Sequence, residues 1–135
     1  MSNKDIRLAI SLAIDRQQLT KKVLGDGSDT PTGFVASGLA KDPKTGVDFA
    51  KQQAVPNTVD YNVKLAKQHW QKGLKALGTK NVTLTITASN DDPTSNPITQ
   101  YMKSELQQDL PGFKLNIRNV PGQVANQEVL KGDFD

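Results

Sequence analysis

Few residues in this chain could do chemistry, and cysteine is absent from all 135 positions. This composition excludes disulfides, thiolate catalysis and cysteine-based zinc sites. His69 is the single histidine, so a metal site built from several imidazoles is excluded too. A histidine that acts as a general base needs a positioned partner, and no acid stands one helical turn before or after His69. We therefore interpret His69 as a structural residue.

Two other polar stretches resemble ligand sites without completing one. Asp91 and Asp92 are adjacent carboxylates in a loop before a helix start, where acids more often turn or cap the backbone. Residues 25–29 lack the alternating ligands and terminal glutamate of a calcium loop. They also follow a helical pattern and contain no lysine, so they do not match a phosphate-binding loop. We predict no catalytic residue, no metal site and no cofactor, and hence no enzyme.

The charge distribution suggests an alternative function, that of a basic α/β domain that binds nucleic acid. The net charge is +3, and residues 41–80 hold eight Lys against three Asp. That segment contains no arginine, the residue that reads guanine edges and stacks on bases. Singly spaced lysines are typical of the solvated face of a helix. We therefore expect no nucleic-acid partner.

Hydrophobic periodicity predicts the elements of the first half of the chain. Residues 5–14 form a helix capped by Asn3 or Asp5, and a second helical stretch follows from residue 15 until Gly25 ends it. Residues 28–58 are rich in Gly, Pro, Thr, Ser and Asp and have no period. An irregular stretch of this length inside a domain indicates a functional loop or a segment that packs against something else.

The second half of the chain predicts a βαβ unit. Residues 60–77 form the clearest helix, capped by Asp60, and residues 82–88 alternate apolar residues with threonine as a strand does. A helix begins near Pro97 with Ser95 or Asn96 as its cap, and residues 113–118 alternate again. Two strands joined by a helix are parallel, with a right-handed connection. A helix at 124–130 and the entry to a third strand at 132–135 follow.

Several short sequence motifs occur along nearly the whole chain, and both their residues and their order are informative. They include Asp-Ile-Arg-Leu-Ala-Ile-Ser-Leu-Ala-Ile-Asp-Arg at 5–16, Leu-Pro-Gly-Phe-Lys-Leu at 110–115 and Gly-Asp-Phe-Asp at 132–135, with further matches at 23–27, 32–35, 61–62, 66–67, 82–86 and 119–121. In this order they resemble the peptide- and oligopeptide-binding proteins of ABC importers, the family-5 extracellular solute-binding proteins.

The resemblance implies an α/β fold with a small, mostly parallel sheet, as in one lobe of a type II periplasmic-binding-protein-like fold. Residues 1–135 are then a single domain, excised from the C-terminal lobe of a longer receptor. The implied function is the capture of extracellular peptides for import. Nickel, haem or an oligosaccharide remains the alternative solute on the same scaffold.

The same resemblance implies the partners and the location of the protein. The expected partners are a peptide ligand, the remaining lobe of the receptor and the permease subunits of the transporter. The implied location is the surface of a Gram-positive bacterium, as a lipoprotein, or the periplasm. No direct membrane insertion of this chain is expected, because no apolar run approaches the ~18 residues that span a bilayer.

The ligand-binding residues are expected where the strands end, because open α/β sheets bind ligands beyond the carboxyl ends of their strands. This reasoning selects Asn119, Gly122 and Gln123 after the second strand, with residues 89–92 after the first. The family commonly has an aromatic residue after the Val-Pro pair, where this chain has Gly122. Bare backbone there could pair with an extended ligand, and a simple turn into the next helix is the other interpretation.

Overall fold

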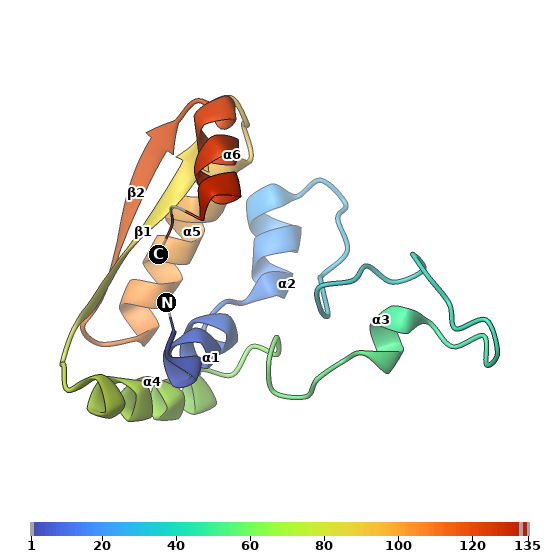
Figure 1. Ribbon diagram of the computed structural model, residues 1–135, viewed down its shortest axis with the longest axis horizontal. Coiled ribbons are helices and arrows are strands. Elements are labelled where there is room, and N and C mark those ends of the chain that lie inside the picture. The colour runs from blue at the N-terminus through green and yellow to red at the C-terminus, as the bar shows by residue number, and fades with distance from the viewer. Residues whose placement is uncertain (1, 133, 135) are drawn as a thin grey trace.

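The structure is a computed structural model that describes residues 2–132 and residue 134 (Figure 1). Its elements along the chain are the helices α1 (Lys4–Leu12) and α2 (Arg16–Gln18), the π-helix η1 (Leu19–Leu24), α3 (Phe49–Gln52), α4 (Val63–Leu77), β1 (Val82–Ser89), α5 (Ser95–Asp109), β2 (Phe113–Val120) and α6 (Gly122–Lys131). The predicted α/β class is confirmed.

The two strands form the parallel pair that the sequence predicts. β1 and β2 pair in register from Val82 opposite Phe113 to Ser89 opposite Val120, and α5 connects them. The third strand expected at 132–135 stays a prediction, because residues 133 and 135 lie outside the described residues. Gly132 ends α6 with a left-handed φ of 72°, a conformation that glycine adopts without steric cost.

Helices α1 and α4 pack closely against each other below the sheet (Figure 1). Gly73 of α4 is the point of closest approach. A Cβ atom there would lie 2.6 Å from Cδ1 and 3.1 Å from the backbone nitrogen of Ile6. Because a side chain at residue 73 would meet the backbone of α1 as well as Ile6 itself, only glycine permits this spacing.

Trp70 connects this helical layer to the sheet. Its side chain is fully buried, and its ring meets that of Phe113 edge-to-face with centroids 5.7 Å apart. The indole Nε1–H donates a hydrogen bond of 2.8 Å to the carbonyl of Pro111, just before β2. The bond satisfies the one polar group of a buried tryptophan.

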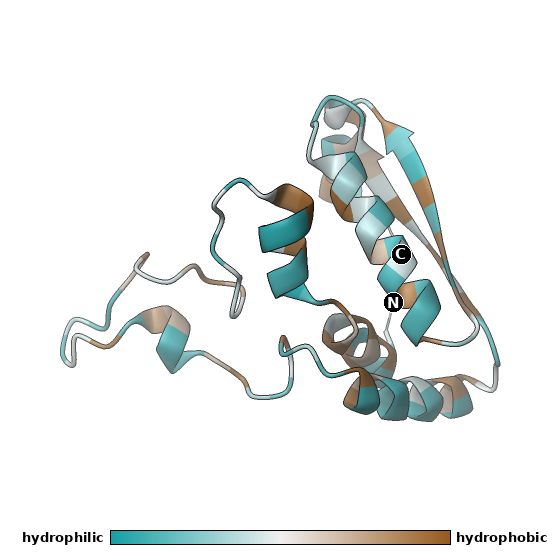
Figure 2. Cartoon of the chain, turned by 180° about the vertical axis from the view of Figure 1, so that it is seen from behind, coloured by the Kyte–Doolittle hydropathy of each residue, from teal (hydrophilic) through white to brown (hydrophobic). Residues whose placement is uncertain are grey.

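The two faces of the sheet differ in chemistry, and each receives a different helix. The apolar face of β1 and β2, which includes Leu84 and Leu115, packs with Leu106 of α5 in the hydrophobic core. On the other face, Arg118 of β2 and Thr87 of β1 both contact Glu128 of α6. Helices α5 and α6 therefore cover opposite faces, as the two views show (Figures 1 and 2).

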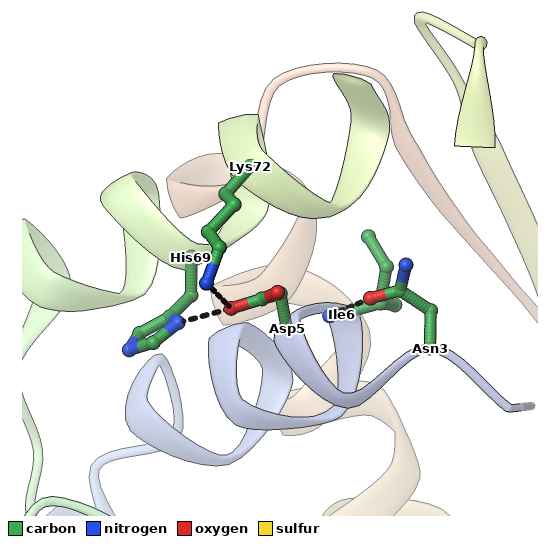
Figure 3. A network of polar contacts seen from close by, with 5 residues as sticks. All are labelled: Asn3, Asp5, Ile6, His69 and Lys72. Atoms are coloured by element: carbon green, nitrogen blue, oxygen red, sulfur yellow. Dashed lines mark hydrogen bonds and ion pairs between the residues drawn. The ribbon is translucent and has the colours of Figure 1, made fainter. Parts of the chain in front are cut away.

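The helix starts differ in part from those expected. Asn3 caps α1 as predicted, by accepting a hydrogen bond from the backbone N–H of Ile6 (Figure 3). Asp60 does not cap α4, because Asn62 accepts from the N–H of Leu65 and takes that place. Neither Ser95 nor Asn96 caps α5, which follows Thr94 and contains both residues in its first turn. Pro97 is tolerated there because the first N–H groups of a helix have no intrahelical acceptor.

Arg16 fastens the start of α2 to the segment that precedes α4. Its guanidinium donates to the carbonyls of Ser11 at 2.8 Å and Val59 at 2.9 Å, and to Ser11 Oγ at 2.9 Å. Partial burial lowers the pKa of Arg16 below the ordinary arginine value. The cation is held by neutral oxygen acceptors rather than by a salt bridge, so its role is to fix the local chain path.

Residues 28–58 lack regular structure over most of their length, as predicted, but the short helix α3 within them was not predicted. They extend away from the helices and the sheet (Figure 1). Phe34, Leu39 and Val55 in this segment are exposed.

Gly73→Ala is expected to lower the free energy of unfolding by about 1–3 kcal/mol, because the added methyl group overpacks the α1–α4 contact. Urea unfolding followed by circular dichroism measures the change. Gly33→Ala is the matched control, since nothing lies within 4 Å of a Cβ at residue 33. Equal midpoints for the two variants would contradict the close approach.

Candidate ligand-binding edge

The carboxyl ends of β1 and β2 meet at one edge of the sheet, because the strands are parallel and in register. Ser89 and Val120 are the last pair, and the N–H of Asn90 extends the ladder by donating to the Val120 carbonyl at 3.0 Å. From this edge the chain passes to α5 on one face and to α6 on the other. Connections that leave neighbouring strands for opposite faces open a crevice between them, where α/β sheets bind ligands.

The structure places the three predicted binding residues around this edge. Asn119 is exposed and pairs with Ala88, on the sheet face that α5 covers. Gly122 and exposed Gln123 open α6, which covers the other face. The three residues therefore flank the edge from both sides rather than forming one cluster.

Gly122 is held by the loop that follows β1. Its backbone N–H donates a hydrogen bond of 2.6 Å to Oδ2 of Asp91. A Cβ at this position would lie 3.1 Å from Ser89 Oγ and 3.4 Å from Asp91 Oδ2. Glycine lets the start of α6 approach the end of β1, and the Gly122 N–H is bonded within the chain. Of the two interpretations given for Gly122, the structure therefore favours the turn into α6.

Asp91 and Asp92 have the backbone roles that the sequence suggested. The Asp91 carboxylate lies at the first residue of α6, where the helix dipole favours a negative charge. Asp92 Oδ1 accepts 2.8 Å hydrogen bonds from the backbone N–H and from the hydroxyl of Thr94, and these bonds lower the pKa of Asp92. Within the described part of the chain, no three His, Asp or Glu residues lie close enough to hold a metal ion.

The sequence did not predict the hydrogen bond between Asp91 and Gly122. The predicted parallel pairing did indicate that the loops holding these two residues lie near each other. Parallel pairing brings the two loops to one edge, but it does not say which donor meets which acceptor. The contact of Glu128 with Arg118 and Thr87 was also missed, because it depends on the rotation of α6 about its own axis.

His69 has a partner that lies far away in the sequence. Its Nδ1 is 2.8 Å from Oδ1 of Asp5, and Nζ of Lys72 is 3.3 Å from the same oxygen (Figure 3). The hydrogen bond from His69 is the main reason that the pKa of Asp5 is lowered. This cluster joins α1 to α4, away from the carboxyl edge of the sheet (Figure 1), which supports the structural interpretation of His69.

The fold is an α/β arrangement around a two-stranded parallel sheet, and comparison with known proteins names the family. The family model named "Bacterial extracellular solute-binding proteins, family 5 Middle" matches residues 1–135. The chain belongs to this family.

Individual relatives agree with this assignment. A dipeptide-binding protein of Lactococcus lactis subsp. cremoris is 34% identical over the whole chain, which spans 24% of that protein. OppA of Listeria monocytogenes, solved bound to peptide, superposes on 99% of this chain with a TM-score of 0.91 and 34% identity; the chain covers 26% of it.

A further solved structure, the peptide-binding protein of a peptide ABC transporter, is 38% identical, with a TM-score of 0.90 over 98% of this chain and 57% of its own. These likenesses confirm the predicted type II binding-protein fold. None of the helices among the described residues is long and apolar enough to cross a bilayer.

Asp5→Asn is expected to lower the urea midpoint at pH 7, because it weakens the contacts with His69 and Lys72. The pKa of the Asp5 carboxyl is lower in the folded state than in the unfolded state, so its ionised form stabilises the fold at pH values above the unfolded-state pKa, near 3.8. This stabilisation is lost as the pH falls through the folded-state pKa of Asp5. The midpoints of wild type and variant should therefore converge in acid. A constant difference from pH 7 to pH 2 would contradict the assignment.

Asp91→Ala is expected to speed hydrogen exchange of the Gly122 amide by about tenfold, because a charge-assisted hydrogen bond is lost. Exchange is read by NMR. Asp92→Ala is the matched control and should speed exchange at Thr94 while leaving Gly122 near its wild-type rate. The same change at Gly122 in both variants would argue against a specific Asp91 bond.

Proposed function

We propose that this chain is part of the C-terminal lobe of the substrate-binding component of a peptide ABC transporter, which captures extracellular peptides for import. The observation that carries the proposal is the family match over residues 1–135, together with the superposition on a binding protein that holds a peptide. The chain spans about a quarter of these relatives, so residues 1–135 are proposed as one piece of a two-lobed receptor.

The carboxyl edge of the sheet is the proposed ligand-facing surface of this piece. Asn119 and Gln123 expose amide side chains on its two sides. An amide donates from its nitrogen and accepts at its oxygen, so it can bond to either polar group of a peptide main chain. Recognition of main-chain groups would admit peptides of varied sequence, as a nutrient receptor requires.

The remaining assignments follow from the same proposal. The partners are a peptide, the rest of the receptor and the permease subunits that receive the ligand. The location is the outer surface of a Gram-positive bacterium, where the receptor is a lipoprotein. The chain binds its solute and does not transform it, which suits a surface with the exposed amides of Asn119 and Gln123 rather than a paired acid and base.

The proposal is tested by calorimetry on the full-length receptor with a pool of short peptides, then with its best binder. Combined Asn119→Ala and Gln123→Ala changes should weaken binding by about tenfold to a hundredfold, from the loss of hydrogen bonds. Asn126→Ala with Gln127→Ala is the matched control, because both residues are exposed amides on α6.

Equal effects of the two pairs would remove the edge from the binding surface. Binding of nickel, haem or an oligosaccharide with no binding of peptides would overturn the peptide assignment. The isolated chain should bind peptides weakly or not at all, because a cleft between two lobes needs both of them. Micromolar or tighter binding by residues 1–135 alone would contradict that requirement.

A further inference from the structure

Residues 28–58, named the arm below, project from the rest of the molecule (Figures 1 and 2). The arm is joined to the body near its ends. Thr30 Oγ1 lies 3.1 Å from Thr20 Oγ1 of η1, and the hydroxyl of Ser11 in α1 donates to the Thr58 carbonyl. Between these points the chain makes a long excursion that contributes no residue to the hydrophobic core.

The arm has a defined shape that its own polar groups maintain. Asp48 Oδ2 accepts from the N–H of Gly38 at 2.6 Å, and the Phe49 N–H donates to the Ala40 carbonyl at 2.9 Å. Lys41 and Asp48 form an antiparallel bridge. Residues that are seven to ten positions apart are thus tied together, which distinguishes the arm from an unstructured linker.

This ordered arm displays apolar side chains to the outside. Phe34 is 106% exposed, Leu39 74% and Val55 62%. Phe34 and Val55 also line a hollow of about 290 Å³ between the two limbs of the arm, together with Val35 and Ala50. An exposed aromatic residue beside an apolar hollow marks a surface that another protein surface covers.

The charge of the arm limits the kind of partner. It carries three Lys and three Asp, so its net charge is zero within a chain of net charge +3. A surface that binds a nucleic acid or an anionic membrane would carry excess positive charge. The arm instead fits an uncharged, apolar protein surface with a side chain that enters the hollow.

Longer proteins contain the arm in the same position. The superpositions with TM-scores of 0.90 and 0.91 cover 98% and 99% of this chain, so they include the arm. Over the whole aligned chain the sequences are only 38% and 34% identical, and this chain makes up 57% and 26% of those proteins. A projecting arm that keeps the same backbone path in proteins of such different sequence is expected to be held by other parts of the longer polypeptide.

We infer that the arm docks on an apolar surface of the receptor polypeptide outside residues 1–135, with Phe34 as its anchor and an apolar side chain of that surface seated in the hollow. The inference rests on the proposed function, in which this chain is one part of a longer receptor. The docked arm would fix the position of the lobe piece relative to the remainder of the protein.

The test is hydrogen exchange by mass spectrometry on the full-length receptor. Phe34→Ser should speed exchange of the arm amides, including those of Gly38 and Phe49, by about tenfold, because it removes the anchor. Lys44→Ser is the matched control, since Lys44 is an exposed polar residue of the same arm, and should leave the rates within about twofold. Peptide binding of both variants is measured by calorimetry in parallel.

Equal exchange rates in the Phe34→Ser and Lys44→Ser receptors would overturn the docking. Arm protection that rises with receptor concentration would overturn it in favour of a second copy, and protection that needs anionic vesicles would overturn it in favour of a membrane. If Phe34→Ser frees the arm in a receptor that binds no peptide, docking stands and the proposed function fails. If the receptor binds peptides and Phe34→Ser leaves exchange of the arm amides unchanged, the proposed function stands and the docking fails.

Discussion

The burial of Trp70 is the constraint on which the rest of the structure depends. This one side chain packs into the α1–α4 layer, meets Phe113 of β2 edge-to-face and donates its indole N–H to the Pro111 carbonyl. Because it has an apolar contact with the first residue of β2 and a polar contact with the turn before it, it fixes the sheet relative to the helices. Gly73, one turn further along α4, then allows α1 to close over the core.

A sheet positioned in this way can carry a binding edge because its two faces differ. The apolar face needs α5 to cover it, whereas on the opposite face Thr87 and Arg118 contact Glu128 of α6. The helices therefore diverge from the carboxyl ends of β1 and β2. The bond from the Gly122 N–H to Asp91 links the two loops at that point, so the edge is a shaped surface rather than two independent turns.

The polar contacts away from the edge maintain the chain path between the body and the arm. Arg16 binds the carbonyls of Ser11 and Val59 on either side of the long excursion, and the bridge from His69 to Asp5 keeps α1 on α4. The Thr20–Thr30 and Ser11–Thr58 hydrogen bonds hold the two ends of the arm, and its apolar middle stays outside the core. The molecule thus has two separate features, the carboxyl edge of the sheet and the arm.

The sequence by itself determined the longer helices, the two strands and their parallel pairing, because periodicity and chain connectivity are local or topological properties; it did not reveal α3 or the π-helical form of η1. It also led to the family and to the edge where Asn119 and Gln123 lie. Only the tertiary structure decided that Asp5 partners His69, that Asp91 holds Gly122, and that Asn62 rather than Asp60 caps α4. Those pairings depend on side-chain distances of a few ångströms between elements, and hydrophobic spacing along a chain carries no information about them.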